Sequence, residues 1–212
     1  MKEKEIVHII IAIIILAVVI GFSHIISNEI AYLGTAILLS FIIIGINVLS
    51  KKIMANALDS DIENSIWFAS RYGFKERSQF KKEIPLGVIL PLVITAITFG
   101  IIKFTTILTY ETSALKRRAA KRFGYYSFTE MTDWHIALIG ASGIFATLLL
   151  AFISYWIPSL EDLARYSAFY AFFNLIPFSK LDGAQIYFGS RVLWTLLAVI
   201  ATIFAGYALF LV

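Results

Sequence analysis

The chain has 212 residues, of which 59% are hydrophobic and 15% are charged, and its mean hydropathy is +0.84. This composition excludes an ordinary water-soluble domain and predicts a polytopic membrane protein. The absence of cysteine excludes disulfides, thiolate zinc ligands and cysteine nucleophiles, and the formal charge of +4 is too modest to indicate a nucleic-acid partner.

Six apolar segments are long enough to lie in a membrane. They cover residues 6–22, 30–49, 84–102, 134–157, 163–178 and 193–212. The first follows Lys2 and Lys4, as a signal peptide would, but it is longer than a signal core and no small-residue cleavage pattern follows it. We therefore expect an uncleaved first span and a single all-α membrane domain over residues 1–212.

The charged loops conflict with six full spans. Loops 50–83 and 103–133 both carry many Lys and Arg residues, which favour the cytoplasmic side in short loops, yet only segment 84–102 separates them. Pro85, Gly87, Pro91 and Gly100 interrupt that segment, and such breaks are tolerated at membrane depth where protein covers the backbone. The sequence predicts five transmembrane helices plus a re-entrant segment at 84–102, with a sixth, proline-kinked span as the alternative.

This arrangement fixes an expected topology. The N-terminus and both basic loops lie in the cytoplasm, loop 23–29 lies outside because it has no Lys or Arg, and the loop after Phe178 returns to the cytoplasmic side. The basic stretch 115–126 is expected to lie on anionic lipid, so the bilayer is the first expected partner.

One polar stretch, "NLIPFSKLDG" at 174–183, stands out from the apolar chain. Pro177 interrupts a helix, Gly183 permits close backbone approach, and a carboxylate at membrane depth usually faces a partner or water. The pattern of Asn174, Pro177, Leu181, Asp182 and Gly183 resembles a core element of the site-2 proteases, which are intramembrane zinc metalloproteases of peptidase family M50. The resemblance covers residues from about 40 to 212 and implies a site-2-protease-like core in which Asp182 is a metal ligand.

The other half of that family's zinc site is missing. Its His-Glu-x-x-His motif places two imidazoles on one helix face beside a general base, and this sequence contains no such motif. Two registers remain open for its former position. The first leaves Asn47, Val48 and Lys51 there, and the second, which we favour because "ASRYG" follows it, leaves Asp61, Ile62 and Ser65.

Other side chains offer weak replacements. Asp61 and Glu63 with Asp182 would make an oxygen-only set suited to Mg²⁺, Ca²⁺ or Mn²⁺, but they are also ordinary polar residues of a solvated loop. The three histidines, His8, His24 and His135, are far apart in sequence, and Ser142 lies in a small-residue helix where packing is its expected role. For Lys180 the sequence leaves two alternatives equally open: it pairs with Asp182 in a helix-breaking turn, or it snorkels to the lipid headgroups.

These observations leave three functions open. The first is a catalytically degenerate site-2-protease-like protein, a pseudoprotease, that binds or regulates transmembrane segments of partners and needs no cofactor. The second is a divergent metalloprotease that uses Asp182 with non-standard ligands, and with zinc if the family chemistry persists. The third is a small transporter or lipid-binding membrane protein with Asp182, Asn174 and Lys180 along a polar path.

Overall fold

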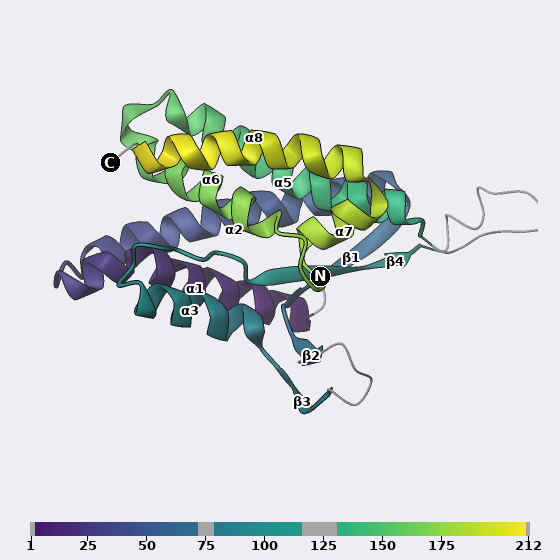
Figure 1. Ribbon diagram of the computed structural model, residues 1–212, viewed down its shortest axis with the longest axis horizontal. Helices are drawn as coiled ribbons and strands as arrows, with labels where there is room; N and C mark the ends of the chain where they lie inside the picture. The colour runs from purple at the N-terminus through teal and green to yellow at the C-terminus, as the bar shows by residue number, and fades with distance from the viewer. Residues whose placement is uncertain (1–2, 72–78, 116–130, 211–212) are drawn as a thin grey trace, which may run out of the picture.

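The computed structural model describes residues 3–71, 79–115 and 131–210. Most of this part of the chain is helical, and the long helices run side by side along the long axis of the molecule (Figure 1). Four described helices are long and apolar enough to cross a membrane: α1 (Glu3–Ile26), α2 (Tyr32–Ala57), α5 (Asp133–Tyr155) and α8 (Arg191–Phe210). None of these four contains a proline, which allows each to run without interruption.

Two groups of helices make up the bundle. Helices α1 and α2 form an antiparallel hairpin, and α2 also packs against α5. Helix α5 packs against α6 (Glu161–Asn174), α7 (Asp182–Gly189) and α8. A single 3₁₀ turn, η1 (Pro158–Leu160), joins α5 to α6. One buried cluster packs α1 and α2 against Leu163, Tyr166 and Tyr170 of α6, and a second lies within the α5–α8 group.

The expected fifth span is shorter than the sequence suggested. Of the expected segment 163–178, residues 163–174 lie in α6, which has 14 residues and ends at Asn174. At 1.5 Å per residue this helix is about 21 Å long, and it does not meet the length of a candidate span. The polar stretch that begins at Asn174 ends the helix, because Pro177 has no backbone N–H to continue the hydrogen-bond pattern.

Strands at one end of the bundle show that the expectation of an all-α chain was wrong. β1 (Ser60–Ile66) pairs antiparallel with β4 (Leu108–Ala114), and β2 (Ala69–Arg71) pairs antiparallel with β3 (Gln79–Ile84). Along β1 buried residues alternate with more exposed ones, which is the period of a half-buried strand. The side chain of Glu5 fastens β1 to α1 by accepting hydrogen bonds from Asn64 Nδ2 at 3.0 Å and from Lys52 Nζ at 2.8 Å.

Between β3 and β4 the chain makes an excursion along the bundle. Helix α3 (Leu86–Ile97) has 12 residues, about 18 Å of helix, and is followed by a turn in which Phe99 and Gly100 have positive φ. Residues 101–107, the return segment, then lead back to β4 (Figure 1). The two ends of this excursion meet at Trp67, which donates its backbone N–H to Ile107 and accepts from the N–H of Gly87, each at 2.9 Å.

Gly87 is required for that meeting. A Cβ atom at this position would lie 2.2 Å from the carbonyl oxygen of Ile107, so no other residue allows the start of α3 to touch the end of the return segment. Segment 84–102 thus has the shape of the predicted re-entrant segment, a short helix whose entry and exit adjoin. Its position relative to the membrane remains a prediction.

Cysteine labelling tests this topology, since the chain has no native cysteine. Lys82, Ala114 and Ser27 are exposed. We expect the cysteines of Lys82→Cys and Ala114→Cys to react with an impermeant maleimide from one side of the membrane, and the cysteine of Ser27→Cys to react from the other side. All three positions should label after detergent solubilisation, which controls for reactivity. Opposite sides for Lys82→Cys and Ala114→Cys would refute a re-entrant segment.

Candidate functional site

The polar stretch after α6 brings Asp182 into the interior of the bundle. Helix α6 ends at Asn174, the chain turns through Pro177 and Ser179, and Asp182 begins α7 with its side chain only 1% exposed. Gly183 makes this turn possible, because a Cβ atom there would lie 2.1 Å from the carbonyl oxygen of Leu175. Leu181 is buried beside it. The motif residues therefore have distinct structural roles in presenting one carboxylate inward.

The partner of that carboxylate is Lys51 of α2. Its Nζ atom lies 2.5 Å from Asp182 Oδ2, and both side chains are 1% exposed. Lys51 Nζ also lies 4.8 Å from the ring centre of Tyr110 on β4, so an aromatic face covers the cation. Three elements that are distant in sequence, α2, β4 and α7, thus meet around one buried ion pair.

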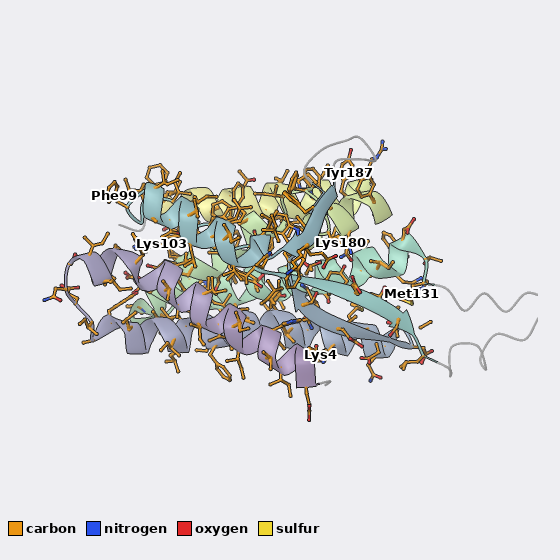
Figure 2. All side chains as sticks on the ribbon, turned by 90° about the horizontal axis from the view of Figure 1, so that it is seen from below. Lys4, Phe99, Lys103, Met131, Lys180 and Tyr187 are labelled. Carbon is orange, nitrogen blue, oxygen red and sulfur yellow. The ribbon has the colours of Figure 1, made fainter. Side chains whose placement is uncertain are left out.

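Lys180 is not the partner of Asp182, so the structure contradicts the first of its two alternatives. Its ammonium group is 67% exposed and lies 3.4 Å from Glu111 Oε1 on β4. The backbone carbonyl of Lys180 accepts from Thr109 Oγ1 at 2.6 Å. These contacts hold the turn against β4 and direct the Lys180 side chain to the surface, two residues before a side chain that points inward. Figure 2 labels Lys180 near the strands.

Tyr110 closes the site from the side of the strands. Its hydroxyl donates to the carbonyl of Ile136 at 2.8 Å, and the side chain is 1% exposed. Burial, and then the nearby Asp182 carboxylate, raise the pKa of the Tyr110 hydroxyl well above its usual range. The hydroxyl consequently stays protonated at neutral pH and remains a donor.

Close helix packing creates the space in which the pair lies. A Cβ atom on Gly143 of α5 would lie 2.6 Å from Lys51 Cε and 2.9 Å from Asn47 Nδ2. Ser50 and Ser142 fasten the same two helices, since Ser50 Oγ donates to the Ser142 carbonyl at 2.9 Å. The expected packing role of Ser142 and its glycine neighbours is consistent with these contacts.

Several buried polar atoms near the pair have no hydrogen-bond partner within the described residues. They are both amide atoms of Asn47, Oδ1 of Asn174 and Oδ1 of Asp182. Such groups cost about 1–3 kcal/mol each when they are left without a partner, and buried water commonly satisfies them. The interior around Asp182 is therefore polar beyond the ion pair itself.

The two registers proposed for the missing motif lie on different kinds of element. Asn47, Val48 and Lys51 lie on α2, and the side chain of Lys51 reaches Asp182. Asp61, Ile62 and Ser65 lie on strand β1, where residues four apart do not have the one-turn spacing of a helix. The second register, which the sequence favoured, is therefore not on a helix, whereas the first one is.

The residues around Asp182 do not fit a zinc ion. Lys51 presents an ammonium group, which has no lone pair to donate, at the atom that a metal would need. His8 and His24 lie near opposite ends of α1, and His135 lies at the start of α5 beside Thr132. In the described ranges no three His, Cys, Asp or Glu side chains are grouped so that they could hold a metal ion, and this includes Asp61 and Glu63 with Asp182.

Sequence reasoning identified Asp182 but missed its partners. Lys51 was one residue of a discarded register, and the signal for it was its spacing of four from Asn47, which puts both on one face of α2. Tyr110 had no signal, because its position depends on the pairing of β1 with β4. Comparisons with models of protein families, with curated proteins and with solved structures found no match. The resemblance to site-2 proteases thus rests on the sequence motif alone and stays a prediction.

Removing Lys51 should reveal the strength of the pair. Lys51→Met leaves a buried carboxylate without a cation, and loss of one partner of a buried pair typically destabilises a protein by about 3–5 kcal/mol. Lys180→Met is the matched control, since its exposed contact with Glu111 is worth about 0–1 kcal/mol. In detergent, the thermal unfolding temperature should decrease strongly for Lys51→Met but not for Lys180→Met. Lys51→Met with Asp182→Leu should recover part of it, and equal effects of the two lysine variants would contradict the pairing.

Gly183 should tolerate no side chain. Gly183→Ala forces its Cβ atom into the Leu175 carbonyl, so we expect the yield of folded, monodisperse protein to fall sharply in size-exclusion chromatography. Gly45→Ala on α2 is the control, because a Cβ atom there meets nothing within 4 Å. A Gly183→Ala variant as stable as Gly45→Ala would show that the turn before α7 differs from the one described.

Proposed function

We propose that this chain is a catalytically inactive, site-2-protease-like membrane protein in which a lysine stands in place of metal ligation. The observation that supports the proposal is the buried pair of Lys51 and Asp182. In the resemblance, Lys51 lies at the position of the second histidine of the zinc motif and Asn47 at the first. The cation of Lys51 neutralises the carboxylate that the family uses as a ligand.

This substitution removes the zinc-dependent chemistry of the family and keeps the contact between the helices. Val48 replaces the general base in the same register, so neither a metal-bound water nor a group to deprotonate it is provided by α2. The buried pair still joins α2 to the start of α7, as a metal would. What such a fold retains is a bundle that can associate with transmembrane segments of other proteins, and we propose that it binds or regulates such partners.

The polar interior also bears on the two alternatives. A divergent metalloprotease needs at least two more ligands beside Asp182, and the described group that contacts this carboxylate is the ammonium of Lys51. A polar transport path through Asp182, Asn174 and Lys180 loses one of its members, because Lys180 lies at the surface. We therefore propose the inactive protein ahead of both alternatives.

Rebuilding the motif tests the proposal. The triple variant Asn47→His, Val48→Glu, Lys51→His restores His-Glu-x-x-His on α2 opposite Asp182, so we expect it to bind about one zinc ion per chain, as measured by plasma mass spectrometry. Adding Asp182→Ala should abolish this binding, whereas adding Asp61→Ala should not.

The unaltered protein is the comparison for the triple variant. It should purify without stoichiometric zinc and should not cleave a transmembrane reporter peptide. Stoichiometric zinc in the unaltered protein that is lost in Asp182→Ala would overturn the proposal. Failure of a folded triple variant to bind zinc would place the former motif elsewhere.

A further inference from the structure

An apolar cavity of about 470 Å³ lies between α6, α8 and the return segment. Its walls include Ile102, Phe169, Phe172, Phe173 and Leu209, and the polar residues among its lining are Lys103 and Thr202. The volume is within the range of about 300–1,000 Å³ that is usual for small-molecule sites. The cavity is separate from the Lys51–Asp182 pair, which shares no lining residue with it.

Lys103 gives this cavity a charge. Its Nζ donates to the hydroxyl of Tyr166 at 2.7 Å and lies 4.6 Å from the centre of the same ring. Across residues 3–71, 79–115 and 131–210, no carboxylate lies within ion-pair distance of this ammonium group. A half-buried cation next to apolar walls is thus available to an anionic ligand.

The cation lies toward the end of the bundle, where a lipid headgroup would be. Lys103 is found toward the same end as Phe99 and apart from Lys180 (Figure 2). Its partner Tyr166 is in the first half of α6. Close to it, Tyr32 at the start of α2 donates a hydrogen bond of 2.7 Å to Asp162 of α6. The cavity, by contrast, extends along α6 to Phe173. A charged group at one end and an apolar channel along the helices match the two parts of a phospholipid.

We propose that this cavity binds one acyl chain of an anionic phospholipid and that Lys103 holds the phosphate of its headgroup. The aromatic side chains of α6 and the residues around Gly206 on α8 line the acyl chain. Tyr166 keeps the ammonium group in place and leaves two of its three N–H donors for the phosphate. The inference is independent of the proposed function, because it involves neither Asp182 nor Lys51.

Gly206 allows the cavity to be filled without disturbing its surroundings. A Cβ atom at Gly206 meets nothing within 4 Å, so the side chain of Gly206→Phe has room to enter the space that the acyl chain would occupy. Gly45→Phe is the matched control, since a Cβ atom there is equally free and Gly45 does not line the cavity. Lys103→Gln tests the charge, and Lys103→Arg keeps it.

Lipid binding is measured on the full chain in mild detergent by native mass spectrometry and by the shift in unfolding temperature on adding phosphatidylglycerol or phosphatidylcholine. We expect phosphatidylglycerol to bind about fivefold more tightly than phosphatidylcholine, as one lysine near a lipid surface provides. Lys103→Gln should remove this difference while Lys103→Arg retains it. Gly206→Phe should abolish binding of both lipids and Gly45→Phe should not.

Three results would overturn the inference. Equal binding of the two lipids by the unaltered chain would remove the role of Lys103 in recognising an anion. Undiminished lipid binding by Gly206→Phe would place the acyl chain outside this cavity, as would loss of binding in Gly45→Phe to the same extent. If Gly206→Phe fails to fold, Gly206→Leu fills less of the space and should weaken binding in the same direction.

Discussion

The ion pair between Lys51 and Asp182 is the interaction on which the arrangement of the described helices depends. Removing two charges from water is costly, and their attraction compensates for it only where the geometry holds them together. Here the two atoms are 2.5 Å apart in the interior and come from helices separated by most of the chain. A bundle held only by apolar contacts has many similar packings, whereas a single buried pair favours one of them.

The residues around the ion pair provide the space and the cover that this geometry requires. Gly143 lets α2 approach α5 closely enough for the stem of Lys51 to pass, and Gly183 lets the turn before α7 fold back on Leu175. Tyr110 covers the cation from β4. Small residues and a helix break, which weaken isolated helices, are therefore located where the pair needs space. This explains why the strand pair, absent from the expected fold, is part of the site.

The segment through α3 and the return segment is likewise held by specific backbone contacts. A short helix followed by extended chain leaves backbone groups that lipid cannot satisfy, so the chain must lie against protein. Gly87, Trp67 and Ile107 join its two ends by hydrogen bonds, and the return segment runs past α6. One consequence is the apolar space between this segment, α6 and α8, at whose edge Lys103 lies. The proposed loss of metal chemistry and the proposed lipid site thus concern opposite parts of the fold.

The sequence by itself determined the apolar helices and the inward carboxylate. Long apolar runs without proline predicted α1, α2, α5 and α8, since a membrane requires such segments, and the break at Pro177 with Gly183 marked Asp182. Only the tertiary structure decided that Lys51 and not Lys180 meets that carboxylate. Neighbours in sequence point to different sides of a turn, while the contact between α2 and α7 depends on how whole helices pack. Strands β1 and β4 depended likewise on pairing between segments more than 40 residues apart, which local pattern does not encode.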